Sequence, residues 1–146
     1  MTASQLSTLV QDSVARCRAV GLRRTAALED LLRVLIESAR PMTLAELADS
    51  KSLKNRCDRA TVFRLLVRLE KHGILRRLGL HDRSAYYTII LPDVHNDYLI
   101  CTECGVIEKL DIACPVHELE EQISRDSGFR KLYHELEFFG VCPKCG

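Results

Sequence analysis

The sequence lacks the apolar features that carry a chain into or across a membrane. Its longest uncharged apolar stretch, around Tyr86–Pro92, is far shorter than the ~20 residues that a membrane-spanning helix needs. Residues 1–12 also lack the basic start and apolar run of a secretory signal. We therefore expect a cytoplasmic protein with no membrane partner. Internal repeats and low-complexity tracts are absent as well, which excludes a repeat architecture.

The composition that is present suits a globular chain of one medium domain or two small ones. The chain has 146 residues, of which 47% are hydrophobic, enough for a real core. It also contains seven cysteines. Because a protein without an export signal stays in a reducing compartment, these cysteines indicate metal ligands and free thiols rather than disulfides.

Charge is divided unevenly between the two parts of the chain. Residues 1–91 hold 16 Lys and Arg against 9 Asp and Glu, a net charge of +7. Residues 92–146 hold 5 against 11, a net charge of −6, so the overall value of +1 hides the division. A basic part joined to an acidic part indicates that one of them meets a polyanion. The alternative is chance clustering of charges on solvated faces.

The basic part has the pattern of several helices followed by a two-stranded hairpin. Apolar residues at helical spacing, with Thr25, Thr43 and Asp58 as N-caps, mark three of the helices. The predicted helices cover residues 7–20, 25–38, 43–48 and 58–72, the polar stretch 50–57 connects the last two, and the predicted strands cover 74–77 and 85–91. This order is typical of a winged helix-turn-helix domain, whose last helix enters the major groove of DNA.

The first turns of the helix over 58–72 carry side chains suited to reading double-stranded DNA. Arg59 and Arg64 can bond guanine edges or phosphates, and Phe63 can press on a thymine methyl group. Arginines on the hairpin would touch backbone phosphates. The predicted DNA-contacting residues are Arg59, Thr61, Phe63, Arg64, Arg76 and Arg77. In the alternative interpretation the domain binds protein, Phe63 belongs to the core, and the arginines only maintain solubility.

The acidic part begins at Pro92 and reads as a small α/β domain. Strands are predicted over 95–101, 106–110 and 131–141, with a helix over 115–127 between the last two. Two Cys-x-x-Cys-Gly sequences stand in this part, and two thiolates three residues apart in a tight turn can hold one metal ion. Together they offer a four-cysteine tetrahedron for structural zinc, formed by Cys101, Cys104, Cys142 and Cys145. Cys17, Cys57 and Cys114 have no such partners and are expected to be free cysteines.

A second metal site is predicted from the histidines of the acidic part. His95 and Asp97 alternate on a strand, so their side chains leave the same face. His134 faces inward from the last strand, and His117 stands near the start of the intervening helix. A set of three histidines and one aspartate, His95, Asp97, His117 and His134, would bind Zn²⁺ as a tetrahedron, or Fe²⁺ or Mn²⁺ with added water. The alternative is that each histidine has a structural role.

Several of these motifs resemble those of the ferric uptake regulator family. Ala60–Arg64 reads Ala-Thr-Val-Phe-Arg and resembles that family's Ala-Thr-Val-Tyr-Arg. His95–Cys101 reads His-Asn-Asp-Tyr-Leu-Ile-Cys and resembles its His-His-Asp-His-Leu-Ile-Cys. Phe139–Cys142 resembles its Tyr-Gly-x-Cys, and the two cysteine pairs resemble its structural zinc site. The resemblance implies a homodimer, a winged-helix domain, a dimerisation domain and repression triggered by metal binding.

The chain also departs from the family pattern. The family often has a further metal site near the hinge, and its ligand positions are occupied here by Asn96, Tyr98, Pro41 and Thr88, so we expect that site to be absent. The other regulatory metal site of the family corresponds to His95, Asp97 and His134, and there His117 stands where the family has an acidic residue on the helix. Phe63 stands where the family has tyrosine, which keeps the ring contact and loses a hydroxyl bond.

Taken together, these patterns predict an α+β fold. An N-terminal winged helix-turn-helix DNA-binding domain over 1–91 precedes a small α/β dimerisation domain over 92–146, which carries the four-cysteine zinc site. The predicted function is a metal-dependent repressor of metal-uptake or metal-homeostasis genes. It binds a two-fold DNA operator as a homodimer when its regulatory metal site is filled, with no small-molecule substrate and no enzyme activity. The alternative is a peroxide-sensing or constitutive regulator of the same fold, in which zinc is purely structural.

Overall fold

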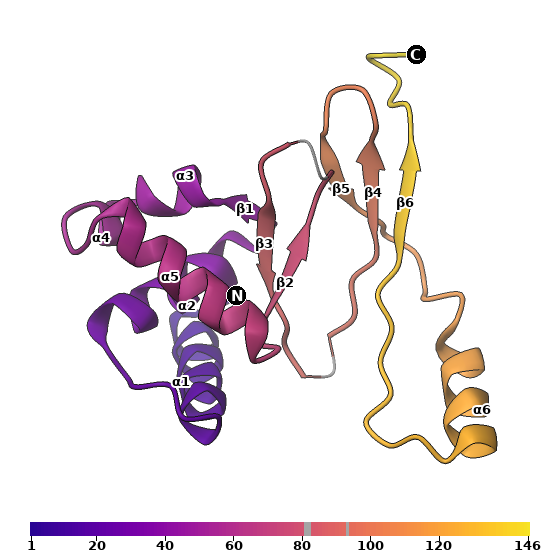
Figure 1. Cartoon of the computed structure of the whole chain (residues 1–146), viewed down its shortest axis with the longest axis horizontal. Helices are drawn as coiled ribbons and strands as arrows, with labels where there is room; N and C mark the ends of the chain where they lie inside the picture. The colour runs from indigo at the N-terminus through magenta and orange to yellow at the C-terminus, as the bar shows by residue number, and fades with distance from the viewer. Residues whose placement is uncertain (81–82, 93) are drawn as a thin grey trace. The chain divides into compact units, whose positions relative to one another are not determined.

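The computed structural model describes residues 1–80, 83–92 and 94–146 (Figure 1). The chain has the predicted α+β fold and divides into two compact units, Met1–Pro92 and Asp93–Gly146. The predicted division falls one residue earlier, after residue 91. No helix of the described residues is both long and apolar enough to pass through a bilayer.

The described residues of the first unit form five helices and one three-stranded sheet. The helices are α1 (Ala3–Ala19), α2 (Ala26–Ser38), α3 (Leu44–Ala48), α4 (Lys51–Lys54) and α5 (Arg59–Lys71). The strands are β1 (Met42–Thr43), β2 (Leu75–Leu78) and β3 (Tyr86–Ile89). They pair antiparallel in the order β1-β3-β2, so the hairpin of β2 and β3 gains one short additional strand from the segment before α3.

Capping side chains begin three of these helices where the sequence predicts. Thr25 and Asp58 accept hydrogen bonds from the backbone N–H groups of Leu28 and Thr61, at 3.1 and 2.9 Å. Thr43 forms a capping box with Glu46, which satisfies backbone donors in both directions. The same device begins α1 at Ala3 rather than at residue 7, because Thr2 and Gln5 also form a capping box.

The sequence interpretation missed helix α4. The stretch 50–57 is rich in polar residues, but Leu53 lies within it and is completely buried. One buried leucine is enough to dock a single helical turn onto the core. That core joins the apolar face of α2, which includes Leu31 and Leu35, to Val62, Leu66 and Leu69 of α5. The core side of α5 therefore fixes which of its faces points outward.

Over residues 94–146 the second unit has a three-stranded sheet and one helix. Its elements are β4 (Tyr98–Cys101), β5 (Ile107–Lys109), α6 (His117–Ser127) and β6 (Glu137–Gly140). The strand order is β5-β4-β6, in which β4 runs antiparallel to β5 and parallel to β6. The observed strand β6 is therefore shorter than the strand predicted over 131–141. Residues 131–136 are irregular, and Lys131 has a positive φ of 57° that an extended strand does not permit.

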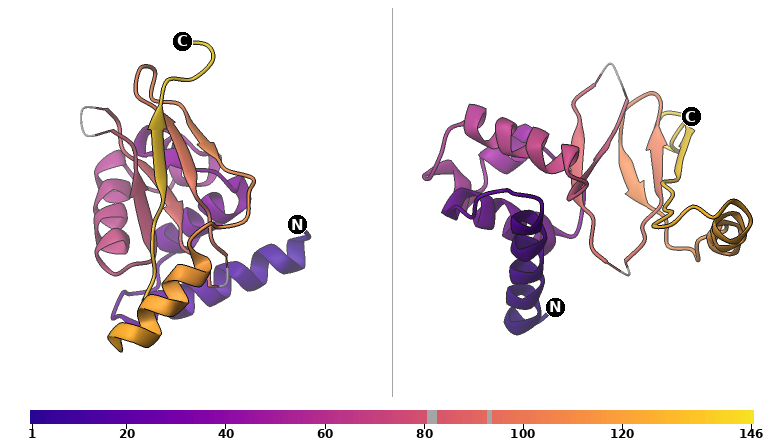
Figure 2. Two further views of the ribbon diagram at one scale, coloured as in Figure 1. Left: turned by 90° about the vertical axis from the view of Figure 1, so that its right-hand side faces the viewer. Right: turned by 60° about the horizontal axis from the view of Figure 1, so that its bottom comes forward.

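Helix α6 stands apart from the strands of its own unit, as Figures 1 and 2 show from several directions. None of its side chains is buried. In the described part of this unit the buried residues are Asp97, Tyr98, Ile100 and Cys101, all on or next to β4. The apolar side chains Leu119 and Ile123 of α6 are about half exposed, so this helix has an apolar face that its own unit does not cover.

Candidate metal centres and nucleic-acid interface

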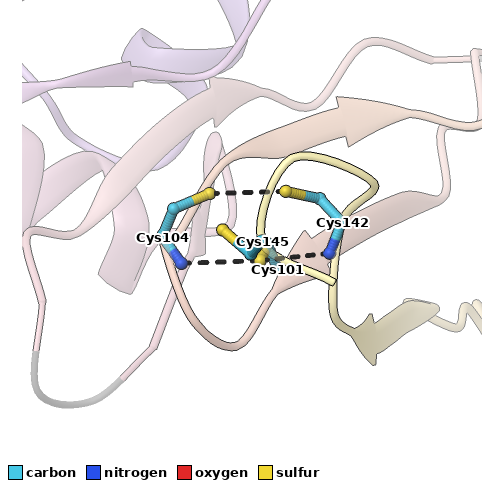
Figure 3. A group of neighbouring side chains, drawn as sticks. All are labelled: Cys101, Cys104, Cys142 and Cys145. Atoms are coloured by element: carbon cyan, nitrogen blue, oxygen red, sulfur yellow. Dashed lines mark hydrogen bonds between the residues drawn. The ribbon is translucent and has the colours of Figure 1, made fainter.

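The four cysteines of the paired motifs come together at one end of the second sheet. Cys101 ends β4, Cys104 lies in the turn to β5, and Cys142 and Cys145 follow β6 (Figure 3). Because β4 and β6 are parallel neighbours, the segments that follow them leave the same edge of the sheet. All four sulfur atoms lie within 4.8 Å of one another. This arrangement matches the predicted four-cysteine group.

Backbone geometry favours a thiolate in this group. The N–H groups of Cys104 and Cys142 point at Cys101 Sγ, at 3.4 and 3.3 Å, and lower the pKa of that thiol to about 6. Hydrogen bonding with the Cys142 and Cys104 sulfurs raises the pKa of Cys145 to about 12. Crowded sulfurs resist ionising together unless a cation lies among them. Four thiolates around one ion suit zinc, which takes such ligands as a tetrahedron.

Glycine completes each of the two cysteine turns. Gly105 has a φ of 79°, which an L side chain rarely adopts, and its N–H donates to the carbonyl oxygen of Cys101 at 3.0 Å. The N–H of Gly146 donates to the carbonyl oxygen of Cys142 at 2.9 Å. These bonds close both turns tightly, so the two cysteines of each pair face the same point.

A second group of four possible ligands lies in the same unit. One ligand atom from each of His95, Asp97, Cys114 and His134 lies within 4.8 Å of the others. The Cys114 Sγ is 3.0 Å from His134 Nε2, and the ring centroids of His95 and His134 are 4.4 Å apart. Three of the four predicted ligands are therefore together, and the fourth place is taken by a cysteine.

Asp97 supplies the clearest sign that this group fits a cation. Its side chain is only 3% exposed, and its Oδ1 lies 2.7 Å from His95 Nε2. That oxygen nevertheless forms no hydrogen bond among the described residues. A buried carboxylate oxygen without a hydrogen bond is costly, and a divalent ion bound between it and the imidazole would satisfy both atoms. The donor set of two imidazoles, a carboxylate and a thiol suits such an ion.

His117 does not join this group in the structure, contrary to the prediction of three histidines and one aspartate. It is the first residue of α6, its side chain is 69% exposed, and its Nε2 lies 3.6 Å from Glu121 of the same helix. Because α6 begins only at His117, the preceding loop brings Cys114 to the ligand group instead. The sequence interpretation treated Cys114 as a free cysteine. Its position just before the helix, within reach of the same histidines, was the available signal.

The outer face of α5 is exposed and mixes basic with apolar side chains. Arg59 and Arg64 are exposed, and Phe63 is 47% exposed, so Phe63 is not a core residue. Val67, one turn further along, is exposed to the same degree, and the sequence interpretation did not single it out. Thr61 has a different place, because its hydroxyl donates to Asp58 and accepts from Arg64, at 2.6 and 3.3 Å. It orders the start of the helix and the Arg64 side chain.

The two hairpin arginines have opposite surroundings. Arg77 is exposed, as a phosphate contact requires, whereas Arg76 is buried and only 7% exposed. Successive side chains of a strand point to opposite faces, so the two guanidinium groups leave β2 on different sides. The prediction that Arg76 presents its charge at the surface is corrected accordingly. Arg77 remains a candidate phosphate contact.

Comparison with known proteins agrees with these features. The sequence profile of the ferric uptake regulator family matches residues 19–139. The chain is 32% identical over 128 residues to a ferric uptake regulation protein of Rhizobium leguminosarum bv. viciae, covering 86% of this chain and 87% of that one. It is 31% identical over 140 residues to the peroxide-responsive repressor PerR of Staphylococcus aureus, covering 93% and 90%. Against the ferric uptake regulation proteins of Neisseria, the match spans only 58% of their length.

The fold is also similar to a solved structure. The Helicobacter pylori ferric uptake regulator Fur superposes with a TM-score of 0.70 at 22% sequence identity, covering 96% of this chain and 93% of that one. At this identity the likeness concerns the fold.

Proposed function

Because the chain belongs to the ferric uptake regulator family, we propose that it is a metal-responsive transcriptional repressor. As a homodimer it binds a two-fold operator in double-stranded DNA when its second metal site is filled. The observation that carries this proposal is the second ligand group, in which His95, Asp97, Cys114 and His134 converge on one point. The same chain contains a basic domain whose helix α5 presents an exposed face suited to DNA.

The DNA-binding part of the proposal rests on α5. Its exposed face offers Arg59 and Arg64 for guanine edges or phosphates, and Phe63 for a thymine methyl group. The domain that carries it, over 1–91, has a net charge of +7, which suits a polyanion. Arg77 on β2 adds a phosphate contact.

The two metal groups have different roles in this proposal. Zinc held by Cys101, Cys104, Cys142 and Cys145 stabilises the second unit, where little apolar surface is buried. The second group is regulatory. A metal ion there binds the DNA-binding shape of the dimer more tightly than the other shape, and so shifts the equilibrium between them.

The thiol of Cys114 favours zinc as the sensed ion. Soft thiolate ligands select zinc over Fe²⁺ and Mn²⁺, whereas a set of imidazoles and carboxylates accepts all three. A ligand set that contains Cys114 in place of His117 is therefore expected to prefer zinc. Both groups offer four protein ligands, so a tetrahedral ion in either leaves no open position for a substrate. We accordingly assign the chain no enzyme activity, and we place it in the cytoplasm with the DNA that it binds.

The proposal is tested by DNA binding under controlled metal loading. The probe is a two-fold duplex selected from a random library, and the protein keeps its four-cysteine zinc throughout. Added Zn²⁺ should tighten binding of the parent chain, and His134→Ala should lose this response while keeping one zinc per chain and the dimer. The matched variant His117→Ala should respond like the parent. If His134→Ala still responds to zinc, or His117→Ala does not, the ligand set is wrong.

A second candidate function follows from the similarity to the peroxide-responsive repressor PerR. In that case oxidation of the protein, rather than loss of metal, would release the DNA. Treating the metal-loaded complex with hydrogen peroxide at fixed zinc concentration separates the two. Release of DNA by peroxide without a fall in zinc concentration would favour peroxide sensing.

A further inference from the structure

Each ring nitrogen of His134 has a partner from a different segment of the chain. Its Nε2 faces the ligand group and lies 3.0 Å from Cys114 Sγ, whereas its Nδ1 bonds a carboxylate oxygen of Glu120 from α6. Glu120 is not part of the four-ligand group itself. Both side chains are partly buried, with exposed fractions of 21% for His134 and 24% for Glu120.

The bond between His134 and Glu120 bears on which ring nitrogen of His134 carries a proton. A neutral imidazole has one N–H and one lone pair, and an ionised carboxylate can only accept a hydrogen bond. A hydrogen bond from Nδ1–H to Glu120 requires the proton on Nδ1 and leaves the lone pair on Nε2. Nε2 is the nitrogen that lies 3.0 Å from Cys114 Sγ, so this tautomer offers its lone pair to the ligand group, as a metal ligand must. Carboxylates that bond the far nitrogen of a ligating histidine raise its basicity and hold its ring.

Glu120 also connects α6 to the ligand group. None of the side chains of this helix is buried, and the helix stands apart from the sheet (Figure 2). Its apolar residues Leu119 and Ile123 border a small hollow with Leu132, Tyr133 and His134, but they remain half exposed. The bond to His134 is therefore a specific polar link between this helix and the centre of its unit.

From this geometry we infer that Glu120 is a positioning residue of the second metal site, which sets the His134 tautomer and ties α6 to the metal-binding group. The inference rests on the proposed regulatory site. It adds to that site a residue that does not touch the metal. Glu120 fixes one nitrogen of His134 as donor and leaves the other free to bind the ion.

Three variants of the full-length dimer test the inference, each with its four-cysteine zinc in place. Glu120→Ala removes the acceptor, and Glu120→Gln keeps an oxygen that still accepts from Nδ1–H. Glu121→Ala is the matched control, since it removes the same charge from the next residue, whose side chain is 59% exposed and lies 3.6 Å from His117 Nε2 rather than at His134. Zinc affinity of the second site is measured by competition with a chelator. The protonated nitrogen of His134 is identified by long-range ¹H–¹⁵N NMR before and after zinc is added.

We expect Glu120→Ala to weaken zinc binding by about 10–100-fold and to give a mixture of His134 tautomers before zinc is added. Glu120→Gln should recover most of the affinity and the Nδ1–H tautomer, and Glu121→Ala should match the parent. A purely structural role would change stability and leave the tautomer alone. If Glu120→Ala keeps a single Nδ1–H tautomer and binds zinc within about twofold of the parent, the inference is wrong.

The two proposals fail in different ways. If the parent takes up no second zinc, the regulatory site is wrong, and the tautomer comparison between the parent and Glu120→Ala still decides whether Glu120 orients His134. If the parent binds a second zinc and Glu120→Ala behaves identically in both measurements, the regulatory site stands and only the role of Glu120 is overturned.

Discussion

The two units of the chain are stabilised by different means. The first unit buries a continuous cluster of aliphatic side chains, with Leu28, Leu31 and Leu66 at or below 1% exposure. The second unit buries Tyr98 and Ile100, and its other buried residues in the described range, Asp97 and Cys101, belong to metal-binding groups. A unit of this size buries too little apolar surface to fold on that basis alone. The first unit therefore folds around its core, and we expect the second to depend on bound metal and on a second copy of the chain.

The largest effect should follow from removing the structural zinc. In small zinc domains the metal contributes about 10–16 kcal/mol of binding free energy to folding. Cys104→Ser should lose one zinc per chain, and amide exchange should show the second unit unprotected while α1, α2 and α5 keep their protection. Cys57→Ser is the control, because Cys57 lies in no metal-binding group of the described residues. A Cys104→Ser chain with full zinc content and a protected second unit would show that the comparison is mistaken.

A core substitution in the first unit should destabilise that unit and leave the second unit unchanged. Leu31 is fully buried in α2, so Leu31→Ala removes apolar contacts and leaves a cavity, at a cost of about 2–5 kcal/mol. Zinc content and the protection of the second unit should be unchanged. Leu119→Ala on α6, where the side chain is half exposed, should cost far less in the monomer. Urea unfolding followed separately for the two units measures both variants, and a loss of zinc from Leu31→Ala would argue against independent units.

The effect on DNA reading should be intermediate. Arg64→Ala removes one exposed guanidinium from α5 and should weaken operator binding by about 1–3 kcal/mol if that group contacts a base. Arg125→Ala on α6 removes the same charge from the second unit and serves as the control. Fluorescence anisotropy at matched salt measures both. Equal operator affinity of Arg64→Ala and the parent would remove α5 from its assigned role.

The smallest effect should come from the cap of α2. Thr25 accepts the Leu28 N–H at 3.1 Å, so Thr25→Ala should cost about 1 kcal/mol of the free energy of unfolding. Thr25→Ser keeps the hydroxyl and should recover most of this loss. Chemical denaturation of the two variants and the parent provides the measurement, and only the transition of the first unit should shift.

The sequence predicted the parts of this molecule in which local pattern determines structure. The helix starts at Thr25, Thr43 and Asp58 follow from capping residues, and the four-cysteine group follows from paired motifs with fixed spacing. The places where prediction failed depend on tertiary contacts. Alternating residues over 131–141 suggested a full strand, whereas only Glu137–Gly140 pairs with β4. The burial of Arg76 depends on which face of its strand meets the core, and adjacent arginines do not reveal this.

The second metal-binding group was predicted only in part, because one of its ligands depends on tertiary contacts. His95 and Asp97 are close in sequence, and their approach needs only a short segment. Cys114 reaches His134 through the loop before α6, and the contact depends on where that helix begins. Glu120 is one turn beyond the helix start, and nothing in the sequence separates it from Glu118 or Glu121. Only the folded position of His134 shows which of these carboxylates faces it.

The central claim is that metal in the second site and DNA on the first unit favour the same shape of the dimer. The most direct test measures both affinities on one protein with its four-cysteine zinc in place: operator affinity with and without a second zinc, and zinc affinity with and without operator. A coupling of about 1–3 kcal/mol predicts that zinc tightens DNA binding by about 5–150-fold, and linkage requires DNA to tighten zinc binding by the same factor. Zinc that binds at His95, Asp97, Cys114 and His134 without changing the DNA affinity would contradict the account.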